Sequence, residues 1–413
     1  MVIKRFQNNI CEYIINDNIV ILSNKLNGHW IKIPVECYTV LKYSWNNNID
    51  PYDLVGAFDK SIDKIYYLEM LEMLKTLGLV SDSEYEFNSI HKVTFSFTNS
   101  CNLSCDYCSA ESGIDNVDYL HSEDMKIIID NIIQLAPKVI VISGGEPLMR
   151  NDFFELLAYM RCKYSGKIVL ATNATLITKK AAKLLVEMVD FIEISLDGYD
   201  EESVSYIRGR GVYDKVVTVI KELKSLKFEE ISVSMIVGKN NEAHIGEFIG
   251  FCNRLGVKPV IRNFFNLGRG TSNSNKYLDN DSDIFHICDD DYIDTSSLVS
   301  NRCKAGHNQI SIDRSGNVYP CPNLEFDRFK ILNLLESNIK ISDWGTDSRV
   351  SNIRRKVESL KTYNLNRCSG CNISLFCMPC PAIICNMIED EKKFNYNCEK
   401  MKHYITRLVW EDK

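Results

Sequence analysis

Three cysteines stand close together in the segment CNLSCDYC, at Cys101, Cys105 and Cys108. Thiolates are soft ligands that favour zinc and iron–sulfur clusters. A closed tetrahedral metal site takes four ligands, whereas this loop offers three. A loop of three thiolates can hold a [4Fe–4S] cluster by three of its irons and leave the fourth iron open to a small ligand. The spacing therefore points to a bound group with one position that no cysteine of the loop fills.

The bulk composition limits the classes of protein to consider. The chain has 413 residues, a length that favours two or three domains, and 25% of them are charged. Its net charge of −7 argues against nucleic acid as the main partner. No apolar run approaches the ~20 residues of a membrane span. The start, MVIKRFQNN, lacks the apolar core of a signal peptide. We therefore expect a cytoplasmic protein with no membrane partner.

Cysteine is unusually abundant, with 16 residues. A second group lies in the C-terminal part of the chain, at Cys303, Cys321, Cys368, Cys371, Cys377, Cys380, Cys385 and Cys398. Disulfides are rare in the cytosol, so this clustering indicates metal or iron–sulfur ligation. Four further cysteines fall within apolar helix or strand patterns and are expected to be core residues: Cys11, Cys37, Cys162 and Cys252.

Strand-like and helix-like segments alternate between residues 90 and 285. The strand-like runs are 92–98, 138–143, 167–172, 191–196, 230–237 and 258–264. Alternation of this kind predicts an α/β fold with a parallel sheet. Six such units predict a partial (β/α)6 TIM-like barrel, which is an open relative of the eight-stranded barrel. Beyond about residue 285 the periodicity fades and cysteines accumulate.

The unusual local motifs all follow the ends of predicted strands. They are CNLSCDYC, Gly144-Gly145-Glu146, Thr172-Asn173, Ser195-Leu-Asp197, Asn263 and Gly268-Arg269-Gly270. Each motif alone is weak, because short glycine-containing sequences are usually turns. In parallel α/β folds, however, active sites lie at the carboxyl edge of the strands. Their shared position predicts one functional site at that edge.

Residues 1–89 have the pattern of a small separate domain. Two apolar runs flank the turn tripeptide Asn16-Asp17-Asn18 and predict a hairpin, with a third strand in HWIKI. Helices follow, and in the last of them we expect Ile65, Leu68, Leu71 and Leu74 to form one apolar face. Three short strands followed by three helices predict a winged-helix-like domain.

The loop Cys-x3-Cys-x2-Cys after the first strand, followed by Gly-Gly-Glu after the second, resembles the radical S-adenosylmethionine (SAM) superfamily. The match covers about residues 90–270. The resemblance implies a radical SAM oxidoreductase, in which the open iron binds the amino and carboxylate groups of SAM. One electron then cleaves a carbon–sulfur bond and gives a 5′-deoxyadenosyl radical, which abstracts a hydrogen from the substrate. By this resemblance Cys101, Cys105 and Cys108 are the catalytic cluster ligands.

The same resemblance gives roles to the other strand-end residues. Gly144, Gly145 and Glu146 resemble the strip that binds the amino group of SAM, because glycines allow close backbone approach and a carboxylate suits an ammonium. Asn173, Ser195 and Asp197 stand where the family contacts the ribose and the carboxylate of SAM. Arg208 resembles an arginine that pairs with the carboxylate, for which a bidentate fork is suited.

The C-terminal cysteines, over 286–413, resemble the SPASM domain, which holds two auxiliary [4Fe–4S] clusters. On cysteine spacing alone, a four-thiolate zinc site is the alternative. The resemblance assigns Cys368, Cys371, Cys377 and Cys398 to an outer cluster, and Cys303, Cys321 and Cys380 to an inner one. The total is then three [4Fe–4S] clusters.

Two details of this tail depart from the SPASM pattern. Cys385 competes with Cys380 for one ligand position, because the last short spacing is two residues rather than three. The inner cluster also lacks the usual cysteine before Cys303, since residue 297 is serine. Either Cys288 supplies that ligand, or the inner cluster keeps an open iron that could take a substrate thiolate.

Ahead of such domains, residues 1–89 look like the precursor-peptide recognition element of ribosomal-peptide (RiPP) maturases. In that family an extended leader peptide adds to a sheet edge. The leading hypothesis is therefore a peptide maturase that installs a crosslink in the core peptide, with a cysteine thioether to carbon as first choice. Its partners would be a ribosomally made precursor and a reductant such as flavodoxin or ferredoxin.

Four alternatives stay open at this point. Carbon–carbon crosslinking and epimerisation are other reactions of peptide maturases. Anaerobic sulfatase maturation is disfavoured, because those relatives carry an aspartate directly after the cysteine of the GxVYPC strip, where this chain has Pro322. A non-enzymatic iron–sulfur or leader-binding scaffold would be expected to have lost SAM contacts, and this sequence retains them.

Overall fold

The computed structural model describes residues 5–6, 11–24, 27–81, 90–280, 283, 303–337, 339–377 and 380–411. The described residues form two compact units. The larger unit contains those of 90–283 and 305–357, and the smaller unit contains those of 5–81, 303–304 and 358–411. Cys288 and position 297, which bear on the inner-cluster prediction, lie outside the described residues.

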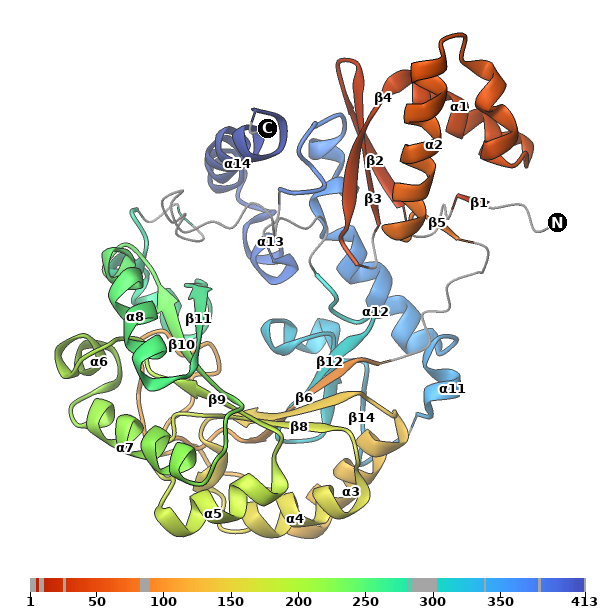
Figure 1. Ribbon diagram of the computed structural model, residues 1–413. Helices are drawn as coiled ribbons and strands as arrows, with labels where there is room; N and C mark the ends of the chain where they lie inside the picture. The colour runs from red at the N-terminus through yellow and green to blue at the C-terminus, as the bar shows by residue number, and fades with distance from the viewer. Residues whose placement is uncertain are drawn as a thin grey trace. The chain divides into compact units, whose positions relative to one another are not determined.

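The larger unit alternates strands and helices, as predicted (Figure 1). Its strands are β6 (Lys92–Thr98), β7 (Val139–Gly144), β8 (Lys167–Thr172), β9 (Phe191–Ser195), β10 (Ile231–Val237), β11 (Lys258–Asn263), β12 (Gln309–Ile312), β13 (Asn317–Tyr319) and β14 (Leu332–Asn333). Its α-helices are α3 (Ser122–Gln134), α4 (Phe153–Lys163), α5 (Lys179–Met188), α6 (Glu201–Arg208), α7 (Val212–Ser225), α8 (Ile245–Leu255), α9 (Arg269–Ser272), α10 (Ser274–Tyr277), α11 (Ile341–Trp344) and α12 (Ser348–Ser359).

Six parallel strands run in chain order from β6 to β11, which confirms the predicted parallel sheet. Alternate residues of β6, such as Phe95 and Phe97, are fully buried. The ring of Phe97 contacts that of Phe153 on α4, so this face packs against the helix layer. Burying each such side chain stabilises the fold by ~1.5–3 kcal/mol. On the opposite face, Ser143, Ala171 and Ser195 lie near the ends of β7, β8 and β9.

Three short strands extend this sheet beyond β6. β12 pairs with β6 in parallel, and β13 and β14 follow as antiparallel neighbours, giving a nine-stranded sheet. The strip that contains Gly316 is the turn into β13, where Gly316 has a φ of 82°. The strands are two to four residues long, which is too short for an alternating hydrophobic pattern to be recognised in the sequence. This stretch of the cysteine-rich tail therefore shares a sheet with the barrel strands.

The smaller unit begins with an antiparallel sheet, in the order β2 (Cys11–Asn16), β3 (Ile19–Asn24) and β4 (Trp30–Pro34). The predicted hairpin is confirmed, with Asp17 at a φ of 51° in its turn. The helices after it are α1 (Val35–Asn47), a 3-10 helix η1 (Pro51–Ala57) and α2 (Ser61–Thr76), and β1 (Arg5–Phe6) pairs with β5 (Val80–Ser81). The element order agrees with the predicted one, except that the middle helix is of the 3-10 type.

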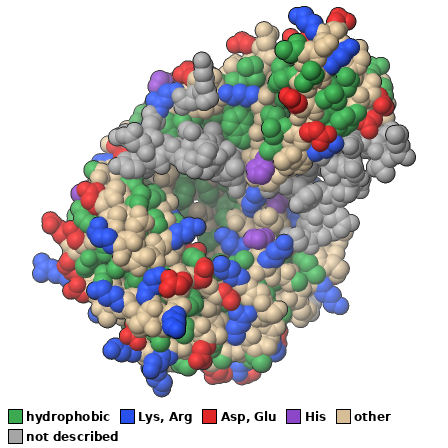
Figure 2. All heavy atoms as spheres, in the orientation of Figure 1, with side chains coloured by type: hydrophobic (Ala, Val, Ile, Leu, Met, Phe, Trp, Pro, Cys, Tyr) green, Lys and Arg blue, Asp and Glu red, His purple; other side chains and the backbone are tan. Residues whose placement is uncertain are grey.

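The predicted apolar face of α2 is wrong in part. Leu71 and Leu74 are buried, but Ile65 is 57% exposed and Leu68 is 38% exposed. The buried face is completed by Tyr67 and Met70 instead. A second, outward group of large side chains therefore remains on α2: Ile62, Ile65, Tyr66, Leu68 and Met73. Figure 2 shows hydrophobic side chains between charged ones over α1 and α2.

The cysteine-rich end of the chain completes the smaller unit, with α13 (Pro381–Met387), α14 (Glu391–Thr406) and several single helical turns. It packs on one face of the N-terminal sheet. The ring of Trp30 contacts that of Phe376 at 4.9 Å, and Asn372 donates to Asn16 at 3.1 Å. These contacts explain why Ile21, on the central strand, is fully buried.

The expected burial of four other cysteines is met in part. Cys37 and Cys252 are buried, whereas Cys162 is exposed on α4, and the side chain of Cys11 lies outside what the structure describes. None of the helices that the structure describes combines the length and the apolar character that crossing a bilayer requires.

Candidate active site

The cysteine loop leaves the end of β6 and folds over the carboxyl edge of the sheet. The N–H of Cys101 donates to the carbonyl of Gly113 at 3.0 Å, which closes the loop on itself. The N–H of Leu103 donates to the Cys101 sulfur at 3.4 Å. Burial is the main cause that raises the pKa of both the Cys101 and the Cys105 thiols. A coordinated metal reverses this tendency, because a ligating thiol is deprotonated.

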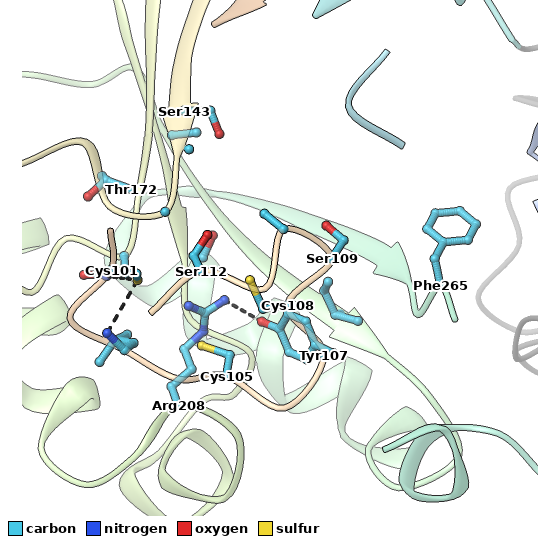
Figure 3. A pocket seen from close by; sticks show the side chains of 18 of the residues that line it. Cys101, Cys105, Tyr107, Cys108, Ser109, Ser112, Ser143, Thr172, Arg208 and Phe265 are labelled. Atoms are coloured by element: carbon cyan, nitrogen blue, oxygen red, sulfur yellow. Dashed lines mark hydrogen bonds between the residues drawn. The ribbon is translucent and has the colours of Figure 1, made fainter. Parts of the chain in front are cut away.

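All three thiols line one cavity of about 270 Å³, together with the inward-facing residues of the strands (Figure 3). Ser143 comes from β7, Ala171 from β8 and Ser195 from β9. These are the alternate positions that face away from the helix layer. Of the predicted strand-end motifs, the three cysteines, Gly144, Gly145, Thr172, Asn173, Ser195 and Asn263 line this cavity, whereas Glu146, Asp197 and Gly268–Gly270 do not.

Two glycines bring the end of β7 against the start of the cysteine loop. A Cβ on Gly144 would lie 2.2 Å from the Thr98 carbonyl oxygen, and one on Gly145 would lie 2.2 Å from the Ser100 carbonyl oxygen. The N–H of Gly145 donates to Thr98 at 2.8 Å. Both glycines also line the cavity. Because these two residues have no side chains, the cysteine loop can lie against the end of β7, and space remains in the cavity.

Glu146 does not line the cavity, and its side chain is fully buried beside it. Its carboxylate accepts hydrogen bonds from the Thr172 hydroxyl at 2.8 Å and from the Asn173 N–H at 2.8 Å. Burial, opposed by these bonds, raises the pKa of Glu146 from 4.5 to about 7. In this arrangement Glu146 joins the ends of β7 and β8 rather than facing a ligand.

We expect the buried Glu146 to make the metal-free protein less stable as the pH rises. A carboxyl group whose pKa is higher in the folded chain binds more protons there between pH 4.5 and about 7. The free energy of unfolding therefore falls as the pH rises through this window. Relative to Glu146→Gln, the wild-type chain should lose on the order of 1–3 kcal/mol between pH 5 and pH 8. Urea unfolding of both proteins across this range tests the slope, and parallel slopes would contradict the assignment.

Asn173 and Ser195 supply polar groups to the cavity wall. The Asn173 amide nitrogen donates to Asn102 at 3.0 Å and lies 3.9 Å from the Cys101 sulfur, and its oxygen accepts from Thr175. These bonds orient the amide, because each of its polar atoms has a fixed partner. Asn173 is thus held at the boundary between the cysteine loop and the open space.

A hydrogen-bonded group of three residues stands at one wall of the cavity. The Arg208 Nε donates to Asp197 at 2.5 Å, and its terminal nitrogen donates to the Tyr107 hydroxyl at 2.5 Å. Tyr107 in turn donates to the same carboxylate, and the Ile236 N–H donates to its other oxygen at 2.7 Å. Arg208 and Tyr107 line the cavity, whereas Asp197 does not. Asp197 therefore orients Arg208 and Tyr107, whose mutual hydrogen bond is drawn in Figure 3.

Several cavity residues carry no assigned role in the sequence analysis. They are Leu103, Tyr107, Ser109, Ser112, Ile236, Phe264, Phe265 and Asn323. Tyr107 could have been found from its place between the second and third cysteines of the loop. Asn323 could not, because it follows β13, which joins the sheet through β12, and the pairing of β12 with β6 is not visible in the sequence.

The thiols predicted for the outer cluster are neighbours within the smaller unit. Burial first, and then the nearby thiols Cys398 and Cys371, raise the pKa of Cys368 to about 11. Burial and the same neighbours raise the pKa of Cys377 to about 12. Among the described residues no group of three or more His, Cys, Asp or Glu is arranged to hold a metal ion. A [4Fe–4S] cluster differs from a single ion, because its own irons and sulfides separate the thiolates.

The three cysteines predicted for the inner cluster are divided between the two units. Cys303 and Cys380 belong to the smaller unit and Cys321 to the larger. Cys303, Cys380 and Cys385 are half-buried, and Cys321 is buried. The choice between Cys380 and Cys385 thus stays a prediction.

The donor set of the cavity fits a cluster with one open iron and a small amino-acid ligand. Three thiols lie on its wall, and among the cavity-lining residues that the structure describes Arg208 is the only side chain with a formal positive charge. A guanidinium matches a carboxylate in geometry and charge. The polar groups of Asn173 and Ser195 lie on the same wall.

A fold with six parallel strands and a three-cysteine loop after the first of them defines the class. A family model for the radical SAM superfamily matches residues 95–252, and the chain belongs to this superfamily. It is therefore an enzyme of the radical SAM type. The family implies a [4Fe–4S] cluster and SAM as cofactors.

The relatives narrow the comparison. The chain is 30% identical over 287 residues to the mycofactocin maturase MftC of Mycobacterium tuberculosis. The aligned region covers 63% of this chain and 72% of that protein. A crystal structure of Streptococcus suis SuiB bound to the precursor peptide SuiA has a TM-score of 0.55 at 16% identity, over 92% of this chain and 97% of that one. Native anSMEcpe with bound AdoMet and the Cp18Cys peptide has a TM-score of 0.53 at 18% identity, over 77% of this chain and 99% of that one. The two structures share the fold of this chain.

Proposed function

We propose that this protein is a peptide maturase that uses SAM and a [4Fe–4S] cluster held by Cys101, Cys105 and Cys108. The observation that carries the proposal is the shared cavity, where these thiols lie with Arg208 and the glycines that end β7. When bound, the cluster and SAM supply a radical that removes a hydrogen atom from the substrate. The protein binds these groups, orients them toward the substrate and encloses them.

In this proposal the predicted cofactor-binding residues each have a part in holding SAM. Arg208 pairs with the carboxylate, held in place by Asp197 behind it. Asn173 and Ser195 meet polar groups of the ribose and the carboxylate. The backbone carbonyl groups at Gly144 and Gly145 accept hydrogen bonds from the amino group. Glu146 acts as a positioning residue, because its buried carboxylate already accepts bonds from β8.

The substrate in this proposal is a ribosomally made precursor peptide. The similarity to a mycofactocin maturase supports a peptide substrate, and the fold shared with SuiB, whose structure holds its precursor peptide, agrees with it. We propose the cytoplasm as the setting and a flavodoxin or ferredoxin as the reductant.

The proposed leader site is the N-terminal domain of residues 1–89. Among the described residues, β2 and β4 are the outer strands of the three-stranded sheet, so each has one edge without a strand partner. An extended peptide can add to such an edge through main-chain hydrogen bonds, while pockets for its side chains give specificity. We propose that the outward side chains of α2, with Ile62 at 72% and Ile65 at 57% exposed, contact apolar residues of the same peptide.

The leader proposal predicts that Ile65→Asp weakens binding of the precursor. Covering an isoleucine side chain contributes ~1.5–3 kcal/mol, so its loss should raise the Kd by about tenfold or more. Fluorescence anisotropy with a labelled precursor measures this. Ile127→Asp is the matched control, because Ile127 is 49% exposed on α3 of the other unit. Equal affinity for both variants would argue against a leader site on α2.

For the bond formed, we propose a thioether between a cysteine sulfur and a carbon of the core peptide. An S–H and a C–H bond break and an S–C bond forms. One hydrogen atom leaves with 5′-deoxyadenosine and one proton goes to solvent, so one electron needs an acceptor. The tail cysteines are proposed to hold two such acceptors: an outer cluster on Cys368, Cys371, Cys377 and Cys398, and an inner one on Cys303, Cys321 and Cys380. Three thiolates at the inner site leave a position that suits a substrate thiolate.

Anaerobic turnover with the precursor peptide and a reductant tests this function. Mass spectrometry should find a loss of two hydrogen masses for each crosslink, and fragmentation should place the link at a cysteine. A linked product without cysteine would favour carbon–carbon bond formation instead. An unchanged peptide mass with inverted residues would favour epimerisation. SAM consumption with no change in the peptide would contradict the proposal that the precursor peptide is the substrate.

A further inference from the structure

The segment after β11, Gly268–Tyr277, contacts the backbone of the cysteine loop along its second half. Gly268 has a φ of 56°, and a Cβ on it would lie 2.5 Å from the Ser109 carbonyl oxygen and 2.6 Å from that of Cys108. Only glycine therefore fits this crossing without moving a backbone. The proposed function leaves the Gly268-Arg269-Gly270 motif without a role. This motif is where the segment after β11 meets the cysteine loop.

Three side chains and one amide of this segment hold the loop. Arg269 donates from its N–H to the Cys108 carbonyl at 3.0 Å and from its Nε to the Cys105 carbonyl at 3.1 Å. Asn273 donates to the Asp106 carbonyl at 3.0 Å, and Lys276 forms an ion pair with the Asp106 carboxylate. The carbonyls of Cys105, Asp106 and Cys108 are thus each bonded from outside the loop.

The holding segment is itself attached to the barrel at its far end. The ring of Tyr277 stacks on that of Phe264 at 4.6 Å and 9°. The Tyr277 carbonyl accepts from the Lys239 N–H at 2.9 Å, and a Cβ on Gly238 would lie 2.6 Å from the same carbonyl oxygen. A segment fixed at β11 and again beyond β10 acts as a rigid support rather than as a free loop.

Arg269 also brings charge to the loop. Its guanidinium Nε lies 3.1 Å from the Cys105 carbonyl oxygen, so a formal positive charge stands beside the backbone of this proposed cluster ligand. Reduction of a cluster adds negative charge, and cluster potentials depend on nearby charge and hydrogen bonding. A cation beside the ligands stabilises the reduced state more than the oxidised one.

From these contacts we infer that Gly268–Tyr277 is a clamp that fixes the cysteine loop, and that Arg269 is a positioning residue which makes the bound cluster easier to reduce. The inference rests on the proposed cluster at Cys101, Cys105 and Cys108. It predicts effects on the loop without metal and on the cluster without substrate, so neither effect requires turnover.

The test compares Arg269→Met with Arg269→Lys and with a matched control. Arg262→Met removes one positive charge from β11, where Arg262 is 49% exposed and paired with Glu193. In the reconstituted protein, a redox titration followed by the EPR signal of the reduced cluster should give Arg269→Met a more negative potential. At a fixed solution potential its ratio of reduced to oxidised cluster should fall about tenfold, which corresponds to 59 mV for one electron. Arg269→Lys should recover most of this, and Arg262→Met should match the wild type.

A second readout uses the metal-free protein. Hydrogen exchange of the amides at 105–109 should be faster in Arg269→Met and in Asn273→Ala than in the wild type and Arg262→Met. If Arg269→Met folds but takes up no cluster while Arg269→Lys does, the clamp is supported. Wild-type exchange and potential in Arg269→Met would overturn it. A wild-type chain that assembles no cluster on the three cysteines would instead overturn the proposed function.

Discussion

Cys105→Ala is expected to abolish reductive cleavage of SAM while the chain stays folded. The three thiols line one cavity, and two thiolates leave a second iron without a protein ligand. We therefore expect loss of the corresponding cluster and no 5′-deoxyadenosine above background under anaerobic reducing conditions. Liquid chromatography of 5′-deoxyadenosine measures the activity, and circular dichroism reports the fold.

Cys162→Ala is the matched control for this variant. Cys162 is exposed on α4, away from the two predicted cysteine groups in sequence. Its replacement should leave SAM cleavage at the wild-type rate. If Cys105→Ala retained cleavage at the rate of Cys162→Ala, the catalytic cluster would have to be assigned to other cysteines.

Gly145→Ala is expected to be nearly as damaging, although it removes no ligand. The new methyl group would stand 2.2 Å from the Ser100 carbonyl oxygen and 2.8 Å from its carbon, so backbone must move. Crowding of this kind costs about 1–3 kcal/mol in stability. Misplacement of reacting groups by about 1 Å can lower a rate by about a hundredfold. We expect a fall in SAM cleavage of that order, with a smaller loss of stability.

The control for added bulk is Gly246→Ala on α8, where a Cβ would meet nothing within 4 Å. This variant should cleave SAM normally. Unimpaired activity in Gly145→Ala would mean that the cysteine loop tolerates displacement from β7, which would contradict the close approach as a requirement for the site.

Much of the larger unit could be predicted because its signals are local. Buried parallel strands are short apolar runs, and β6 and β8 match the predicted bounds. Since their carboxyl ends must meet at one edge, the meeting of the cysteines, Gly145 and Asn173 at one cavity could be expected from topology alone. The strands β12–β14 could not, because they are short, and because they join the sheet through β12, which pairs with β6 across a long stretch of sequence.

The error on α2 has a simple geometric cause. Residues in an α-helix advance by about 100° each, so a constant spacing of three turns steadily around the axis. Ile65 and Leu74, which that spacing connects, point to opposite sides. The buried set of Tyr67, Met70, Leu71 and Leu74 follows the alternating spacing of three and four that one face requires.

The directions in which side chains point at the site could also not be predicted from the sequence. Glu146 was expected to face a ligand, because the Gly-Gly-Glu motif resembles the strip that binds the amino group of SAM. Its direction depends on the donors that β8 presents, and Thr172 and the Asn173 N–H take both carboxylate oxygens. Asp197 likewise faces Arg208 and Tyr107 instead of the cavity. Motif position is a property of the chain, but side-chain direction is set by the neighbouring strand.

The central proposal is that this cavity removes a hydrogen atom from a peptide. The most direct measurement uses a precursor peptide deuterated at carbon throughout its core, incubated anaerobically with the protein, SAM and a reductant. We predict 5′-deoxyadenosine that carries deuterium, in proportion to the crosslinked peptide. Formation of 5′-deoxyadenosine without deuterium, at any extent of SAM consumption, would contradict hydrogen abstraction from the core peptide.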